Sequence, residues 1–336
     1  MIRKPFWLVV VAGLYAAAGS LWAADAAMDT PEVFAPGVIS GAAGEACPAF
    51  TPDGNAVYFD VGSMILVSRR THGTWSKPEI APFSGQWLDH DPTMSPDGSY
   101  LVFVSNRPVK AGGEALGVTV HGKFYPARGG HLWRVDRKGD GWGQPVHLPD
   151  AVNASDRTYA PSIAADGSLY FIRPDTGGVF HIYSSAFVQG AYQPAAQVAV
   201  GDLAASTHDP AIAPDQSFMV FNSTDAKDSG MGDFYIAFRE GDHWGKPIDL
   251  GETINGKPGK WSQWGAHISP DRRTLYYTSD RTTEVTYPRT TEQAKAQLAR
   301  MESWDNGNDN IWSVSLAPWL DAHRATSAGT VRGGPR

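Results

Sequence analysis

The sequence contains a single cysteine, Cys47, among its 336 residues, so no disulfide can form within the chain. Cys47 is either a reactive free thiol or, the interpretation that we favour, a small buried apolar residue at the start of a strand. A mainly helical protein is not expected. The 36 glycines and 24 prolines would interrupt helices, whereas they suit many short strands joined by turns.

Basic clusters are also missing. The formal net charge is -7, and no dense run of Lys and Arg follows the first residues, so the sequence argues against a nucleic-acid partner. No nucleophile elbow, phosphate-binding loop or dinucleotide fingerprint is present. With 42% hydrophobic residues, the chain can nevertheless build a sizeable core, which excludes a disordered protein.

Long apolar runs are absent except at the N-terminus. There Arg3 and Lys4 precede an apolar stretch, residues 6–18, and the small residues Ala23, Ala24 and Ala26 follow. This order is typical of a secretory signal peptide, here residues 1–26, with cleavage after Ala24 or Ala26. The alternative is an uncleaved anchor, but the run is shorter than the roughly 20 residues that span a bilayer. We therefore expect a periplasmic or secreted protein with no transmembrane segment in the mature chain.

Five related segments recur along the chain. Each has the form Pro-x-x-x-Pro-Asp-Gly or a close variant, in which Pro fixes φ at the second turn position and Gly suits the fourth. A β-rich run with little polar alternation follows each one, as expected for strands covered on both faces. The segments are residues 48–54, 92–98, 161–167, 210–216 and 266–272, and the runs are residues 56–59, 100–104, 169–172, 218–221 and 275–278.

A third and a short fourth strand complete each unit. Third strands are expected at residues 64–67, 132–135, 181–183, 234–238 and 310–314, and fourth strands at positions such as 79–80 and 248–250. Four strands per repeated unit predict an all-β fold, a five-bladed β-propeller. The fifth unit lacks a fourth strand, whereas residues 31–34 match one, so the N-terminal strand should close the last blade and leave no exposed sheet edge.

The propeller should span residues 29–322 and be a monomer. Two inserts interrupt the repeats, at residues 108–130 and 282–308. The second insert contains residues 291–301, where Ala294, Leu298 and Met301 fall on one helical face, and we expect a short packed helix there. Residues 323–336 are rich in Gly, Ser and Arg and should form a disordered tail.

These motifs resemble the TolB-type, WD40-like propeller repeat of bacterial periplasmic proteins. The resemblance rests on the Ser-Pro-Asp-Gly turns, the aromatic second strands, Ser-Asn-Arg-Pro at 105–108, Ser-Asp-Arg at 279–281 and Trp-Gly-Lys-Pro at 244–247. It implies a propeller, and it covers nearly the whole mature chain. Proteins of this kind include partner-binding modules of the cell envelope, appendages of peptidases and some sugar-active enzymes, so the resemblance does not assign an activity.

The residues just ahead of each repeat are candidates for a site, because first strands line a propeller channel and their starts form one mouth. The aligned triplets occupy residues 45–47, 89–91, 158–160, 207–209 and 263–265, and two of them continue into His-Asp-Pro. The candidate ligand-binding residues are Glu45, Asp89, His90, Asp91, Tyr159, His208, Asp209 and Trp264.

Three interpretations of this mouth remain open. Asp before Pro can simply cap a turn, and His at a strand start can bond backbone. Alternatively, His90, Asp91, His208 and Asp209 could bind a small ligand or a divalent cation. The third interpretation is glycoside hydrolysis, which needs two carboxylates of the kind found at this mouth. The start of the second unit is also similar to that of five-bladed arabinanase-like glycosidases. We take a non-catalytic binding or scaffolding module, with an envelope protein or glycan as partner, as the leading function, and a glycan-active enzyme as the alternative.

Overall fold

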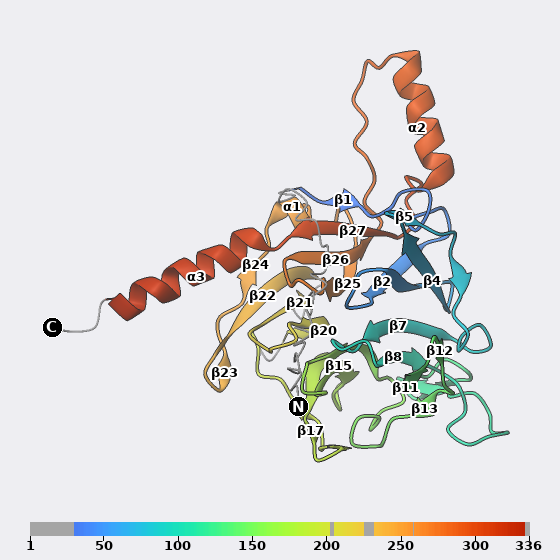
Figure 1. Ribbon diagram of the computed structural model, residues 1–336, viewed down its shortest axis with the longest axis vertical. Helices are drawn as coiled ribbons and strands as arrows, with labels where there is room; N and C mark the ends of the chain where they lie inside the picture. The colour runs from blue at the N-terminus through green and yellow to red at the C-terminus, as the bar shows by residue number, and fades with distance from the viewer. Residues whose placement is uncertain (1–29, 202–204, 225–231, 258, 333–336) are drawn as a thin grey trace, which may run out of the picture.

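The computed structural model describes residues 30–201, 205–224, 232–257 and 259–332. The chain forms five antiparallel sheets arranged as the blades of a propeller (Figure 1), which confirms the predicted all-β fold. The first strands contact one another in ring order, from the first blade to the fifth and back to the first. They are β2 (Glu45–Phe50), β7 (Asp89–Met94), β14 (Tyr159–Ile163), β20 (Ser206–Ile212) and β25 (Gln263–Ile268).

The second strands are the most deeply buried elements, as their lack of polar alternation predicts. Phe59, Phe103, Phe171 and Tyr277 are fully buried, because each second strand is covered on both faces by the adjacent blades. Five apolar clusters fill the spaces between consecutive blades. The second strands are β3 (Ala56–Val61), β8 (Tyr100–Ser105), β15 (Leu169–Pro174), β21 (Phe218–Thr224) and β26 (Thr274–Ser279).

The third and fourth strands lie where the sequence predicts them. Short two-residue fourth strands pair with the third strands at the outer edge of each blade. The third strands are β4 (Met64–Thr71), β11 (His131–Lys138), β16 (Phe180–Ser185), β22 (Asp233–Glu240) and β27 (Asn310–Ser315), and the fourth strands are β6 (Glu79–Ile80), β13 (Val146–His147), β19 (Ala196–Gln197), β24 (Ile248–Asp249) and β1 (Glu32–Val33).

The N-terminal strand closes the ring, as predicted. Strand β1 pairs antiparallel with β27, with Glu32 opposite Ser313 and Val33 opposite Trp312. The adjacent Phe34 packs edge-on against Phe50 of the first blade, with ring centroids 5.4 Å apart. A segment from the start of the described chain thus joins the last blade to the first.

The Pro-Asp-Gly turns are held by their own side chains. In the first two blades Thr51 and Ser95 each donate a hydrogen bond of 2.6 Å to the Asp two residues later. The fourth turn position has positive φ in all five blades, at +67° for Gly54 and still at +58° where Gln216 replaces glycine. These aspartates therefore have the structural role that the turn chemistry predicts.

Further short elements extend the blades. The hairpin β9 (Val118–Val120) and β10 (Lys123–Tyr125) lies in the first insert. The strands β5 (Thr74–Trp75), β12 (Gly141–Trp142) and β23 (His243–Trp244) pair with the ends of third strands, and β17 (Phe187–Val188) pairs with β18 (Ala191–Tyr192). Helix α1 (Glu252–Asn255) is a single turn between the fourth and fifth blades.

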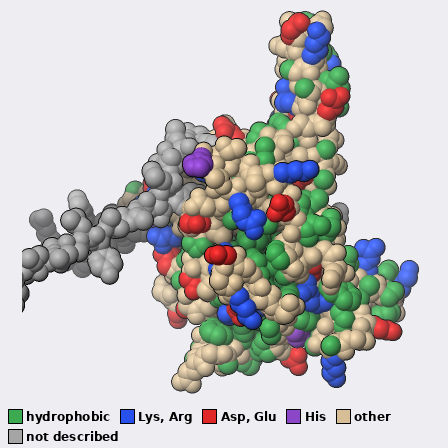
Figure 2. All heavy atoms as spheres, turned by 45° about the vertical axis from the view of Figure 1, so that its right-hand side comes forward, with side chains coloured by type: hydrophobic (Ala, Val, Ile, Leu, Met, Phe, Trp, Pro, Cys, Tyr) green, Lys and Arg blue, Asp and Glu red, His purple; other side chains and the backbone are tan. Residues whose placement is uncertain are grey.

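Two longer helices differ from the sequence expectations. Helix α2 (Thr291–Ser303) forms within the second insert, but it has no buried residue and projects from the propeller (Figures 1 and 2). The prediction that this helix packs against the propeller was wrong, because the insert places the helix away from the blades and leaves Leu298 and Met301 exposed. Helix α3 (Ala317–Arg332) extends into residues 323–332, which were expected to be part of a disordered tail.

The predicted signal peptide, residues 1–26, lies outside the described residues. Within the part of the chain that is described, no helix is both long and apolar enough to cross a membrane.

Candidate functional site in the propeller channel

Each first strand carries a bulge at the same place. The pairing between first and second strands shifts register after the second residue of every triplet. In four blades proline follows the bulged residue, which suits a position where no ladder hydrogen bond is needed. The third triplet residues all have left-handed backbone, with φ of +50° at Cys47, +49° at Asp91, +49° at Ala160, +46° at Asp209 and +62° at Gly265.

The bulge gives the three triplet positions different environments. The first position is buried in every blade, and the second is partly exposed except at Ala46. The third is the bulged residue itself, buried at Cys47, Asp209 and Gly265 and partly exposed at Asp91 and Ala160. We call the end of the channel where the first strands begin the start mouth, and the end with the Pro-Asp-Gly turns the turn mouth.

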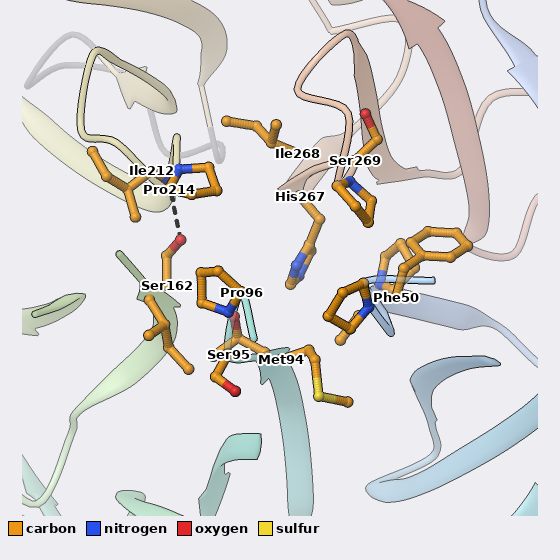
Figure 3. A pocket seen from close by; sticks show the side chains of 16 residues that line it. Phe50, Met94, Ser95, Pro96, Ser162, Ile212, Pro214, His267, Ile268 and Ser269 are labelled. Atoms are coloured by element: carbon orange, nitrogen blue, oxygen red, sulfur yellow. Dashed lines mark hydrogen bonds between the residues drawn. The ribbon is translucent and has the colours of Figure 1, made fainter. Parts of the chain in front are cut away.

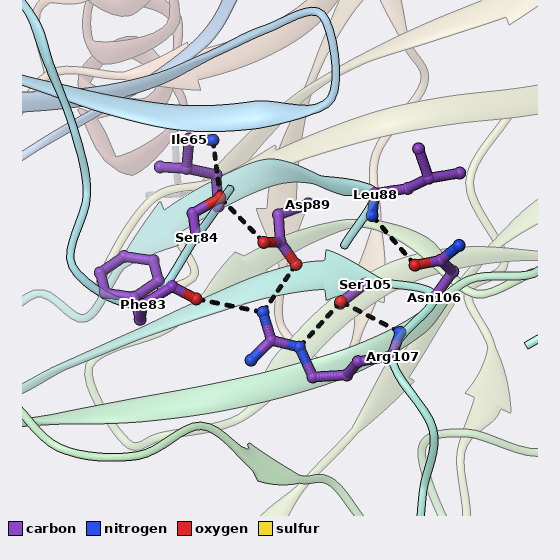
Figure 4. Close-up of polar contacts among 8 residues, drawn as sticks. All are labelled: Ile65, Phe83, Ser84, Leu88, Asp89, Ser105, Asn106 and Arg107. Carbon is purple, nitrogen blue, oxygen red and sulfur yellow. Dashed lines mark hydrogen bonds and ion pairs between the residues drawn. The ribbon is translucent and has the colours of Figure 1, made fainter. Parts of the chain in front are cut away.

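Asp89, at a first position, belongs to a buried structural network (Figure 4). Its Oδ1 accepts a 2.7 Å hydrogen bond from Arg107, and its Oδ2 accepts one of 2.8 Å from Ser84. Arg107 also donates to the Phe83 carbonyl and to the Ser105 hydroxyl. Asp89 is 0% exposed, so the expectation that it offers a free carboxylate to a ligand does not hold.

Glu45, at the same position in the first blade, is similarly engaged. Its Oε2 accepts a 2.7 Å hydrogen bond from the Gly41 amide, and burial raises the pKa of its carboxyl. Neither Glu45 nor Asp89 is available as an exposed acid at the mouth.

Four side-chain rings form a continuous series. Three of them belong to second triplet residues, and the fourth is that of Phe180. His90 lies 5.9 Å from Tyr159, Tyr159 6.1 Å from Phe180, and Phe180 5.7 Å from His208, measured between ring centroids. All four are partly exposed, and they come from the second, third and fourth blades. We call them the ring series. The structure thus brings together three predicted residues, His90, Tyr159 and His208, and adds Phe180, which the sequence analysis did not select.

Trp264 occupies the equivalent position in the fifth blade. It is also partly exposed, and its side chain is a hydrogen-bond partner of the Asp309 carboxylate.

The two third-position aspartates bond to the next blade. Asp91 Oδ2 accepts a 3.0 Å hydrogen bond from the Ala160 amide, and Asp209 Oδ2 accepts one of 2.9 Å from the Gly265 amide. The bulge makes these bonds possible, because left-handed backbone turns the amide away from its own sheet ladder. Part of the role of both aspartates is therefore to join neighbouring blades.

The two histidines of the His-Asp-Pro motifs differ in charge. Burial lowers the pKa of His90, but Asp91, with smaller effects of Asp60 and Asp89, raises it to about 9. Its Nδ1 lies 3.2 Å from Asp91 Oδ1. Burial lowers the pKa of His208 to about 4, and its Nε2 lies 2.7 Å from the Ser206 hydroxyl. At neutral pH His90 is charged and His208 is neutral.

A compact group of acidic side chains lies beside Asp91. Ligand atoms of Cys47, Asp60 and Asp91 all fall within 4.8 Å of one another, and Cys47 Sγ is 3.5 Å from Asp91 Oδ1. Among the described residues, the four predicted metal ligands do not form such a group: only Asp91 takes part. Asp60 was missed because it belongs to a second strand, where the sequence pattern indicates only core.

Burial dominates the electrostatics of this group. It raises the pKa of Asp60 to about 7, with a further contribution from Asp91, and it raises the pKa of the Cys47 thiol well above its usual value. Burial also raises the pKa of nearby Asp209 to about 7. Buried acids at one place favour their neutral forms unless a cation balances them.

A separate cavity opens at the turn mouth (Figure 3). It has a volume of about 190 Å³ and is lined by residues of all five blades, including Pro96, Ile212 and Ile268. His267 points into it, and burial lowers the pKa of this imidazole to about 4. No carboxylate lines this cavity, so it offers no acid pair for hydrolysis. The sequence analysis did not select His267, which follows the bulge by two residues.

Comparisons with known proteins give similar propeller structures at low identity. A putative TolB from Agrobacterium tumefaciens is 14% identical with a TM-score of 0.46, covering 81% of this chain and 90% of that one. TolB from Acinetobacter baumannii is 15% identical with a TM-score of 0.38, covering 59% and 41%. The Bacteroides ovatus xyloglucan PUL GH43B is 14% identical with a TM-score of 0.43, covering 75% and 51%.

This chain therefore spans about half or less of the length of the second and third of these proteins. No family pattern and no curated protein matches the sequence. The strand topology makes the chain a five-bladed β-propeller, and TolB structures are among the solved proteins to which it is similar.

Proposed function

We propose that this chain is an exported, non-catalytic binding module of the cell envelope, and that its ring series binds a glycan. The observation that carries the proposal is the continuous row of His90, Tyr159, Phe180 and His208 at the start mouth. Ligand sites are mostly lined by apolar and aromatic groups with a few placed polar atoms. Rings of this kind pack against the apolar face of a sugar, while imidazole nitrogens bond its hydroxyls.

The burial of the carboxylates supports binding over catalysis. Asp209 is 7% exposed, Asp91 and Asp209 each already accept a backbone hydrogen bond, and Glu45 and Asp89 are buried. A glycosidase needs two carboxyl groups that reach opposite sides of a glycosidic bond.

A glycoside hydrolase is the second candidate, and one feature favours it. Asp91 and Asp209 occupy the same bulge position in two blades, and their pKa values move apart. Burial raises the pKa of Asp209 to about 7. Burial also raises that of Asp91, but His90, the Ala160 amide and Cys47 together lower it below its usual value. An acid and a base with such separated pKa values are typical of hydrolytic pairs.

The test is calorimetric titration with a panel of oligosaccharides. We expect wild type to bind one class of glycan, and Tyr159→Ala and Phe180→Ala to weaken that binding about tenfold or more, the effect of losing roughly 1.4 kcal/mol. Tyr287→Ala is the matched control, because this tyrosine is 75% exposed and precedes the projecting helix α2. Absence of glycan binding, or equal loss in the control, would contradict the proposal.

Export is tested separately by cell fractionation and N-terminal sequencing of the protein from its native host. We expect it in the periplasm or medium, beginning after Ala24 or Ala26. Recovery of intact residues 1–26 on cytoplasmic protein would contradict export.

A further inference from the structure

The channel holds a second feature that glycan binding does not use. Cys47, Asp60 and Asp91 come from β2, β3 and β7, in the first two blades, and place one sulfur and two carboxylate groups together. We propose that this group binds a divalent metal ion of borderline softness, with zinc as the best fit.

The unpaired oxygen of Asp60 supplies the independent reason for a ligand. Asp60 is 9% exposed, and its Oδ1 is buried with no hydrogen-bond partner. Leaving a buried oxygen without a hydrogen-bond partner costs free energy, because the atom has lost its bonds to water. Asp60 is the one residue with such an atom that also belongs to the group of Cys47, Asp60 and Asp91, and an ion that coordinates this oxygen would remove the cost.

The donor set selects the metal. Calcium and magnesium take oxygen ligands, whereas a thiolate favours zinc and other softer ions. In a tetrahedral zinc site, the usual bond lengths separate a sulfur and an oxygen ligand by about 3.5 Å. The Cys47 thiol donates a hydrogen bond to Asp91 Oδ1 with Sγ 3.5 Å from the oxygen, so a zinc ion that replaces the thiol proton would find the two ligand atoms already at this separation. Three protein ligands leave a fourth position open for water or another small ligand.

The backbone and neighbouring side chains hold the donors in place. The Cys47 amide donates to Thr278 Oγ1 at 3.1 Å, and the Ala160 amide holds Asp91 Oδ2. This leaves Asp91 Oδ1 directed at Cys47, with His90 Nδ1 3.2 Å away as the partner that orients it. Metal ligands are usually supported by such outer hydrogen bonds.

The first test uses cobalt as a spectroscopic substitute for zinc in untagged wild-type protein. We expect one equivalent of Co²⁺ to produce a thiolate-to-cobalt charge-transfer band, which one equivalent of Zn²⁺ removes. The chain has one cysteine, so the band can arise only from Cys47, and no variant is needed. Absence of the band, together with no retention of Zn²⁺ in competition with a chromogenic chelator, would overturn the proposal.

Variants then assign the carboxylates. Cys47→Ser should abolish the band, and Asp60→Asn should lower Zn²⁺ affinity more than about 100-fold, since loss of an outer partner alone costs 10- to 100-fold. Asp242→Asn is the control, because this carboxylate is fully exposed and lies outside the group; it should retain the band. Unchanged Zn²⁺ affinity in Cys47→Ser and Asp60→Asn would also overturn the proposal. The ring-series variants should bind zinc normally, which separates this site from glycan binding.

Discussion

The carboxylate of Asp209 accepts a hydrogen bond from the Gly265 amide at 2.9 Å, across the boundary between the fourth and fifth blades. Removing this acceptor leaves a buried amide unpaired, so we expect Asp209→Ala to lower the free energy of unfolding by about 1 to 3 kcal/mol. Asp209→Asn keeps an acceptor oxygen and should cost less. Urea denaturation measures both, and equal stability of Asp209→Ala and wild type would refute the role in joining blades.

Ring closure depends on Phe34, beside the closing strand β1. Its ring packs edge-on against Phe50, Trp75 and Tyr276. Phe34→Ala should lower the free energy of unfolding by about 2 to 4 kcal/mol, near the lower end for buried aromatic residues because Phe34 is only partly buried. Val38→Ala, at a residue that is 43% exposed, should change it by less than about 0.5 kcal/mol. Similar thermal unfolding of the two variants would count against closure by this segment.

The loss of folding stability at acidic pH should come in part from a pair of histidines. His131 Nδ1 lies 2.8 Å from His147 Nε2, and burial, together with His147, lowers the pKa of His131 to about 4. Between about pH 6.5 and 4 the unfolded chain therefore binds a proton that the folded chain excludes, so stability falls as the pH falls through this window. Below about pH 4 both states bind the proton and this contribution levels off.

Thermal unfolding at a series of pH values tests this effect. His131→Asn should reduce the loss of stability between pH 6.5 and 4 relative to wild type, whereas His243→Asn, at an exposed residue, should leave the profile unchanged. A wild-type profile retained by His131→Asn would show that another group causes the acid sensitivity.

The buried pair of Asp89 and Arg107 should be structural. Asp89→Ala leaves the Arg107 guanidinium without its 2.7 Å carboxylate partner, and breaking a buried pair in this way costs about 3 to 5 kcal/mol. We expect a large drop in melting temperature with glycan affinity retained at temperatures where the variant is folded. Loss of glycan binding in the folded variant would instead restore Asp89 as a ligand residue.

Much of the fold is predictable from local chemistry. The Pro-Asp-Gly turns fix where first and second strands meet, and the missing fourth strand of the fifth blade predicts that residues 31–34 close it. Helix α2 shows the limit, because its apolar face at Ala294, Leu298 and Met301 has helical spacing but none of its residues is buried. The spacing of apolar residues predicts a helix, but it does not indicate whether that helix packs against the propeller.

The site is less predictable because it depends on contacts between blades. Alignment of the triplets places His90, Tyr159 and His208 at one mouth, but Phe180 joins them from a third strand. The partner of Asp89 is Arg107, at the end of a different strand, and Cys47 meets Asp60 only after β2 and β3 pair. No spacing along the chain indicates these contacts. The left-handed backbone shared by all five third positions gives no sequence signal either, since Cys, Asp, Ala and Gly all occupy it.

The most direct test of the account is to measure binding and hydrolysis of the same oligosaccharides by the same protein. Wild type should bind a glycan in calorimetry and leave it intact when the mixture is analysed by chromatography after prolonged incubation, and Tyr159→Ala should lose the binding. Release of shorter sugars by wild type, abolished in both Asp91→Asn and Asp209→Asn, would contradict a non-catalytic module and establish the glycoside hydrolase instead.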